Sequence, residues 1–410
     1  MTVLDFSLRA ALAAFVFAGV WSQAEVAAHP RGHASTEPHR ESVATDATDA
    51  DELVQWRTVH VNDPTDEAKA VAFARRAAKQ ARRLGDTGLL REAEKALAAW
   101  RDDPAPPTEI LIIRANTKQI DHQFYAALDD LAIVLNRQPA HPQALLSRAF
   151  VLATTGNAAA GGNDCAALRP TVSVAIRETC SARLSSLTGA LNDAHRRIEA
   201  ILTITPATRR EERSFALSVA GEIADRRGDV DIARKHYSEL LAADPMSVFA
   251  RAVYANFLLS QGEHARAIHV IGDKPQTEAL LVLSALAGLA QDNPTSRDAA
   301  EQLRARMTAD QAAGDFSHAR EYARFAIDYE QNSTLALNFA QMNWRDQKEP
   351  VDARLLARAA IAEDADLILS DLMEWRRQTG LEDPTLDRIL EAATADHAAL
   401  STSGGVLTQP

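Results

Sequence analysis

Apolar residues recur at intervals of three and four along the chain, from about residue 66 to residue 380. This spacing places them on one face of an α-helix, because a helix completes a turn about every 3.6 residues. Short polar breaks such as Gly-Asp, Asp-Pro and Gly-Glu separate the periodic segments. No segment combines alternating apolar residues with hairpin turn signals, as paired strands do. The pattern predicts an all-α chain of short helices joined by tight turns.

The helical segments repeat, and residues 214–247 form the clearest unit. Counted from its first residue, this unit has Gly221 at position 8, Gly228 at position 15 and Pro245 at position 32. It resembles the tetratricopeptide repeat (TPR), a hairpin of two helices that is about 34 residues long. A small residue at position 8 lets the two helices approach closely, and the proline ends the second helix.

The same frame places further hairpins before and after this unit. Well-matched units are expected at 108–139, 142–170, 175–204 and 248–272. Less regular hairpins are expected at 68–100, 277–313, 317–348 and 351–378, with a capping helix at 383–396. The prediction is a TPR-like helix-hairpin solenoid, a right-handed superhelix of about eight or nine hairpins. Its predicted parts are an N-terminal solenoid over 66–272, divergent C-terminal helical hairpins and a cap over 273–396, and a flexible tail over 397–410.

An apolar run from Ala10 to Trp21 follows Arg9 near the start of the chain. The run is short for a membrane span but has the length of the apolar region of a signal peptide. We expect residues 1–28 to be a signal peptide, which predicts a periplasmic or secreted protein of the bacterial export type. An uncleaved anchor and a helix buried in the fold are the alternatives. The polar start of residues 29–65 lacks periodicity, and this range is predicted to be a disordered or irregular linker.

Charge and cysteine content narrow the classes of function. The formal net charge of −12 does not favour binding to nucleic acid or to anionic lipid. The only two cysteines, Cys165 and Cys180, exclude a four-cysteine zinc site. They fall on consecutive predicted helices with a turn between them, so an oxidising compartment favours a disulfide. Two buried free thiols are the alternative.

Three stretches carry a resemblance beyond the repeat itself: 103–115, 164–189 and 318–356. The third is the most distinctive and contains Glu321, Ala323, Arg324, Phe325, Asn343, Trp344, Glu349 and Pro350. On these residues the chain is similar to a group of exported bacterial TPR proteins of unassigned function. The resemblance covers most of residues 84–380. It implies the fold and export, and it implies no catalytic residue or ligand.

In a TPR superhelix the first helix of each hairpin lines a concave face that can bind an extended peptide or a helix. The residues predicted to lie there are Asn116, Gln119, Phe150, Glu222, Asp225, Asn256, Glu321, Phe325, Asp328 and Tyr329. Amides can bond to a peptide backbone, and aromatic rings offer apolar pockets. A solvated surface without a ligand is the alternative. The lysine of the carboxylate clamp found in some TPR proteins is absent, because Ile112 and Ala252 stand at its position.

The sequence contains no phosphate-binding loop, nucleophile elbow, zinc-protease helix or calcium loop. We therefore expect a non-enzymatic interaction scaffold or adaptor of the cell envelope, without a cofactor, whose partners are proteins and not nucleic acid. No membrane span is expected after signal cleavage. A structural accessory subunit of an envelope complex is the second hypothesis. The third is metal delivery through three histidines of the N-terminal tail, His29, His33 and His39.

Overall fold

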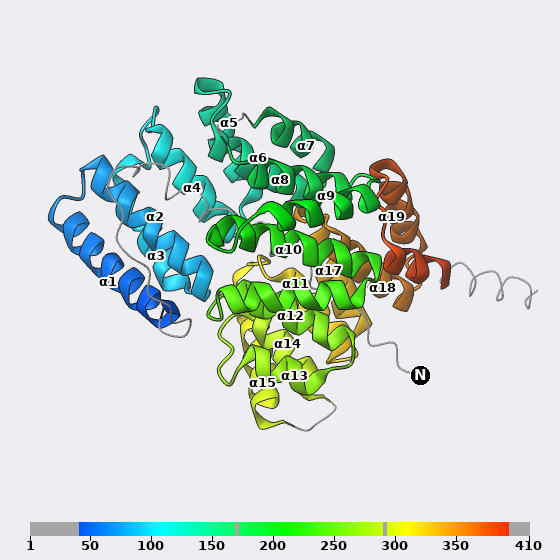
Figure 1. Ribbon diagram of the computed structural model, residues 1–410. Coiled ribbons are helices and arrows are strands. Elements are labelled where there is room, and N and C mark those ends of the chain that lie inside the picture. The colour runs from blue at the N-terminus through cyan, green and yellow to red at the C-terminus, as the bar shows by residue number, and fades with distance from the viewer. Residues whose placement is uncertain (1–40, 169–171, 290–292, 393–410) are drawn as a thin grey trace, which may run out of the picture.

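The computed structural model describes residues 41–168, 172–289 and 293–392. Within this part of the chain, α2 to α19 form nine consecutive helix pairs (Figure 1). The helices are α1 (Glu41–Asn62), α2 (Glu67–Leu84), α3 (Thr87–Ala96), α4 (Thr108–Ile120), α5 (Phe124–Arg137), α6 (Pro142–Thr154), α7 (Ala158–Ala167), α8 (Val174–Ser186), α9 (Leu191–Ile204), α10 (Arg210–Arg227), α11 (Val230–Ala243), α12 (Val248–Ser260), α13 (His264–Ile271), α14 (Glu278–Gly288), α15 (Pro294–Ala313), α16 (Ala319–Asp328), α17 (Ser333–Asp346), α18 (Pro350–Ala362) and α19 (Asp366–Thr379). The predicted all-α fold of helix hairpins is confirmed.

The α10–α11 hairpin shows why the repeat needs its small residues. A Cβ atom at Gly221 would lie 2.5 Å from the ring of Tyr237, so only glycine allows the two helices to pack this closely. Gly228 ends α10 in the left-handed conformation, with φ 85°. A side chain would be strained there, and glycine is not.

The prediction of an irregular linker over 29–65 is wrong for Glu41–Asn62, which forms α1. Leu53 is buried, and Trp56 packs on the same apolar cluster as Phe73 of α2. The ring of His60 also stacks on Phe73, with the ring centroids 5.6 Å apart. Residues 53, 56 and 60 share the three-and-four spacing of a helix face, so packing on α2 stabilises a helix whose first half is polar.

The apolar core is continuous across the predicted boundary at Gly272. One cluster of buried residues extends from Leu111 to Leu390, and a smaller one joins α1 to α4 through residues such as Phe73 and Ile110. The second helix before the boundary, α13, has only eight residues and ends at Ile271, with Gly272 as its cap. The hairpins after Gly272 therefore extend the same stack.

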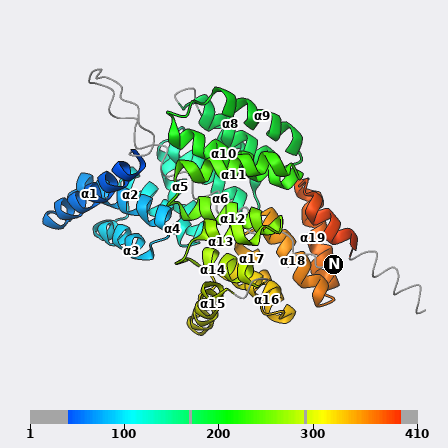
Figure 2. The same ribbon diagram turned by 60° about the horizontal axis from the view of Figure 1, so that its bottom comes forward.

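The superhelix closes on itself, so that C-terminal hairpins lie against N-terminal ones. The backbone N–H of Lys348 donates to the carbonyl of Thr154 at 2.8 Å, and the N–H of Leu191 donates to the carboxylate of Glu382 at 3.2 Å. Figures 1 and 2 both show α19 next to the hairpins that α8 to α11 form. This closure decides which parts of the concave face remain open.

Candidate functional site

Most of the predicted groove residues are buried inside the protein. The exposed fraction is 0% for Phe325 and 1% for both Phe150 and Asn256. Asn116, Glu222, Asp225 and Glu321 are buried as well. They do lie on the first helices of the hairpins, as predicted. They are nevertheless not the free lining of an open groove, because other hairpins of the same chain pack against them.

A network of charged side chains fills the concave face. Arg320 on α16 donates to both carboxylate oxygens of Asp352 at 2.6 Å, and Arg183 on α8 donates to Glu349 at 3.0 Å. The side chains of all four residues are at most 1% exposed. Glu222 lies 3.6 Å from Arg183. The network thus links the first helices of early and late hairpins across the axis of the superhelix.

The remaining predicted groove residues also have partners within the chain. The Asn256 amide oxygen accepts from Arg324 at 3.3 Å, and Asp328 is paired with Arg324 and Arg358. The rings of Phe325 and Tyr329 stack with centroids 5.0 Å apart. Gln119 is half-buried and donates to the backbone carbonyl of Ala115 at 3.2 Å, while Phe150 packs on Phe215. Glu321 differs from these residues because it lines a cavity.

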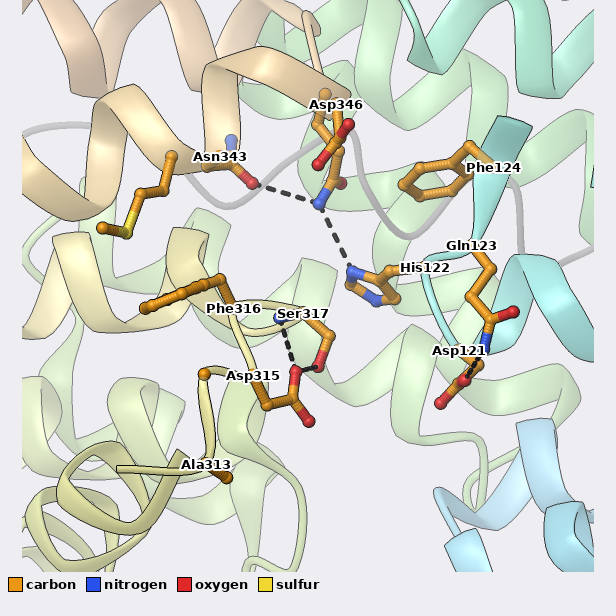
Figure 3. A pocket seen from close by; sticks show the side chains of 13 residues that line it. Asp121, His122, Gln123, Phe124, Ala313, Asp315, Phe316, Ser317, Asn343 and Asp346 are labelled. Atoms are coloured by element: carbon orange, nitrogen blue, oxygen red, sulfur yellow. Dashed lines mark hydrogen bonds between the residues drawn. The ribbon is translucent and has the colours of Figure 1, made fainter. Parts of the chain in front are cut away.

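A cleft between turns of distant hairpins is one of the open spaces in the described part of the fold, and we call it the seam pocket. It lies where two turns meet the end of a helix. The turns are α4–α5 (121–124) and α15–α16 (313–317), and the helix end is that of α17 (342–347) (Figure 3). Its volume is about 460 Å³. The pocket therefore joins the N-terminal and C-terminal parts of the solenoid.

Three carboxylates surround the seam pocket, namely Asp121, Asp315 and Asp346, and all three are exposed. No lysine or arginine lines the pocket. None of the three carboxylates forms an ion pair with a described residue, although ion pairs are frequent elsewhere in the fold. Hydrogen bonds from the backbone and side chain of Ser317 lower the pKa of Asp315. The pocket thus presents negative charge and hydrogen-bond acceptors.

His122 stands between the seam pocket and the interior. Its backbone is left-handed, with φ 57°, at the repeat position where Gly156, Gly189 and Gly228 stand in other hairpins. A side chain in this conformation costs about 1 kcal/mol or more. The imidazole in return reaches the C-terminal half, where its ring lies 5.7 Å from that of His318.

A chain of hydrogen bonds fixes the floor of the seam pocket. Asp352 accepts from the Nδ2 of Asn343 at 2.6 Å, and the Asn343 oxygen accepts from the Nε2 of Gln347 at 3.0 Å. The same Nε2 lies 3.3 Å from the Nδ1 of His122 (Figure 3). The buried ion network therefore orients the groups at the pocket floor.

We expect His122 to make the fold less stable as the pH falls. Burial, with help from His318 and Arg320, lowers the pKa of His122 to about 3. An unfolded histidine has a pKa of about 6.5, so between these values only the unfolded chain binds the proton. The contribution of His122 to the free energy of unfolding should fall by about 1 kcal/mol for each pH unit in this window.

Urea unfolding of the wild type and of His122→Asn, from about pH 7 to about pH 5, measures this contribution. Asparagine tolerates the left-handed backbone. The stability advantage of the wild type should shrink or reverse as the pH falls. A difference that stays constant with pH would show that His122 titrates normally.

A second space, the inner cavity, lies on the other side of His122 and has a volume of about 640 Å³. Its walls come from the end of α2, the starts of α12 and α14, and α15 and α16. Glu321 is one of its lining residues. It is the only predicted groove residue that lines either of these two spaces.

The seam pocket was not predicted from the sequence. His122 could have indicated an unusual turn at this place, since it stands where other units have the turn glycine of the repeat. The carboxylates Asp315 and Asp346 had no such signal, because their position beside Asp121 depends on closure of the superhelix. Trp344 and Trp375 pack between neighbouring hairpins, with ring centroids 4.9 Å apart.

The predicted disulfide between Cys165 and Cys180 is confirmed. It joins α7 to α8, and the two Cα atoms are 5.6 Å apart, a usual separation for a disulfide. The predicted signal peptide, the tail histidines His29, His33 and His39, and the tail at 397–410 lie outside the described residues.

The described part of the chain offers neither a metal-binding cluster nor a membrane-spanning helix. It brings together no group of three His, Cys, Asp or Glu side chains suited to a metal ion. None of its helices is both long enough and apolar enough to cross a membrane.

The described helix pairs show the pairing, turn glycines and close contacts of the repeat. The chain has a TPR-like fold. No protein-family model matches it, and no curated protein does. A tetratricopeptide repeat protein from Parabacteroides merdae is 17% identical, with a TM-score of 0.36 over 71% of this chain and 99% of that chain. Yeast Tom70 is 11% identical, with a TM-score of 0.38 over 88% of this chain and 81% of that chain. A human IFIT1 dimer with m7Gppp-AAAA is 14% identical, with a TM-score of 0.45 over 96% of this chain and 97% of that chain. These similarities concern helix arrangement alone.

Proposed function

We propose that this protein is a non-enzymatic interaction scaffold of the cell envelope, and that its seam pocket binds a lysine or arginine side chain of a partner protein. The observation that supports this most directly is the charge of the pocket. Asp121, Asp315 and Asp346 surround it without ion pairs to described residues, and no lysine or arginine lines it. Carboxylates with exposed oxygens bind a guanidinium or ammonium group through charge-assisted hydrogen bonds.

Two aromatic residues add to the cation site. Phe124 and Phe316 both line the seam pocket, and the side chain of Phe316 is 39% exposed. A cation is attracted to the face of an aromatic ring, and the stem of a lysine or arginine packs on it. The carboxylates and the aromatic rings together therefore suit a lysine or arginine at the tip of a loop of the partner protein.

Placement in the cell envelope rests on two features of the chain. The N-terminal apolar run predicts export, and the Cys165–Cys180 disulfide is of a kind that forms in oxidising compartments. The proposed binding site is the seam pocket and not the concave groove predicted from the sequence, because the closed superhelix buries most of the groove positions.

Site-specific photo-crosslinking in the native host tests the proposal. A photoreactive residue at Gln123, which is exposed and lines the seam pocket, should capture one reproducible partner. The triple variant D121N/D315N/D346N should reduce this capture at least about tenfold, since each charge-assisted contact contributes about 1.5–3 kcal/mol.

The matched control is D102N/D298N/D371N, which removes the same charge at exposed positions away from the pocket. It should leave capture unchanged. Equal capture by both triple variants would contradict the proposal. A second photoreactive residue can be placed at Leu367, which is 83% exposed on α19. If it captured a partner and the residue at Gln123 did not, the result would instead support a structural subunit held by its outer helices.

A further inference from the structure

The inner cavity combines apolar walls with charged groups at different points. Leu84, Leu90, Ile120, Val248 and Phe249 supply the apolar surface. Its volume of about 640 Å³ falls in the range of pockets that enclose small organic ligands. The charged groups of the wall determine which charges such a ligand must have.

Arg82 is an uncompensated cation in this wall. Its side chain is half-buried, yet it has no hydrogen bond or ion pair with any described residue. Burial lowers the pKa of Arg82 to about 10, which leaves the guanidinium charged at neutral pH. The other arginine of the cavity, Arg306, is paired with Glu278 at 2.6 Å and donates to the Gln276 carbonyl at 2.9 Å. Arg306 therefore has a carboxylate partner in the cavity, whereas Arg82 has none among the described residues.

Glu321 is an uncompensated acid in the same cavity. It is only 7% exposed, and its Oε2 is sealed from solvent without a hydrogen-bond partner among the described residues. No other side chain in the described ranges hydrogen-bonds to this carboxylate. Burial raises the pKa of Glu321, and the nearby His318 and Arg320 oppose this shift. A buried acceptor without a donor is costly unless a ligand supplies one.

We infer that the inner cavity binds a short free peptide with apolar side chains, whose carboxylate pairs with Arg82 and whose ammonium group pairs with Glu321. The site is separate from the seam pocket and goes beyond the proposed function. A free peptide has both charges and an apolar body between them, which matches two unpaired groups of opposite sign on an apolar wall. The end of a longer protein chain has only one of the two charges. Because Arg82 belongs to α2 and Glu321 to α16, such a ligand would bridge the first and the eighth hairpin.

Calorimetric titration with free dipeptides tests the inference on the full chain. The probes are Leu-Leu, Val-Phe and Ala-Ala at up to millimolar concentration, together with N-acetyl-Leu-Leu and Leu-Leu amide. Free Leu-Leu should bind, and each blocked form should bind at least about tenfold more weakly, because each loses one charge-assisted contact. Ala-Ala should bind more weakly than Leu-Leu, since it covers less of the apolar wall.

Two variants assign the charges to the ends of the peptide. Arg82→Gln should bind Leu-Leu and its amide alike, and Glu321→Gln should bind Leu-Leu and its acetylated form alike. The seam-pocket variant D121N/D315N/D346N should bind Leu-Leu as the wild type does, so failure of one site leaves the other testable. The inference is overturned if none of the three dipeptides binds. It is also overturned if a blocked form binds as tightly as the free one, which would indicate the terminus of a protein chain.

Discussion

Replacing Asp352 with alanine is expected to lower the free energy of unfolding by about 3–5 kcal/mol, because the buried guanidinium of Arg320 loses its two shortest hydrogen bonds and keeps only Glu349, at 3.2 Å, as a carboxylate partner. Both side chains are 1% exposed, and two hydrogen bonds of 2.6 Å join them. Asp352 also accepts from Asn343 and from the backbone N–H of Glu349, at 2.6 and 3.0 Å. The substitution thus removes four hydrogen bonds to one carboxylate, next to the Arg183–Glu349 pair that joins early and late hairpins.

Urea unfolding and hydrogen exchange of the α16 and α18 amides measure the effect. Asp346→Ala is the matched control, since that carboxylate is exposed and has no ion pair with a described residue; its effect should stay within about 0.5 kcal/mol. The double variant R320M/D352L should recover much of the loss, because it removes both buried charges together. If Asp352→Ala were as stable as Asp346→Ala, the buried carboxylate would contribute nothing to the stability of the fold.

The hairpins could be predicted from the sequence because their determinants are local. Gly228 and Pro245 end helices, and Gly221 allows a close contact with Tyr237 sixteen residues later in the same unit. These effects depend on residues within one repeat. The predicted Cys165–Cys180 disulfide succeeded for the same reason, since both cysteines belong to adjacent helices.

Closure of the superhelix could not be predicted, because it depends on pairs of residues far apart in the sequence. Arg183 and Glu349 are 166 residues apart and still form a buried ion pair. Repeat positions identify the face on which a residue such as Phe150 or Asn256 lies. They do not identify what covers that face, which depends on the angles between successive hairpins.

The distinctive stretch at 318–356 acquires a structural explanation from this network. Arg324 and Glu349 make buried polar contacts with Asn256 and Arg183 of earlier hairpins, and Asn343 donates to Asp352 on the next helix. Asn343 also accepts from Gln347 and so helps to orient the floor of the seam pocket. The sequence pattern that suggested a related group of exported proteins thus describes how this solenoid closes, and Glu321 within it is the member left facing a cavity.

Loss of the Cys165–Cys180 disulfide is expected to lower the local stability of the α7–α8 hairpin by about 3 kcal/mol, the value for closing a loop of about 15 residues. Helix α7 contributes few buried side chains of its own to the core. Its buried residues are only Gly161, Asp164 and Cys165, and glycine is a poor helix former. A Cβ at Gly161 would lie 2.5 Å from the carbonyl oxygen of Ala149, so the position cannot be filled to compensate.

Hydrogen exchange of the variant C165A/C180A measures this loss directly. The amides of α7 should exchange about a hundredfold faster than in the oxidised wild type, since about 1.4 kcal/mol corresponds to a factor of ten. The amides of α10 and α11 should change little, because a solenoid transmits stability mainly between neighbouring hairpins. Reductant should speed exchange in the wild type and leave the cysteine-free variant unchanged. Equal protection of α7 in both proteins would mean that the ion pair of Arg148 with Asp164, at 2.6 Å, holds the helix without the disulfide.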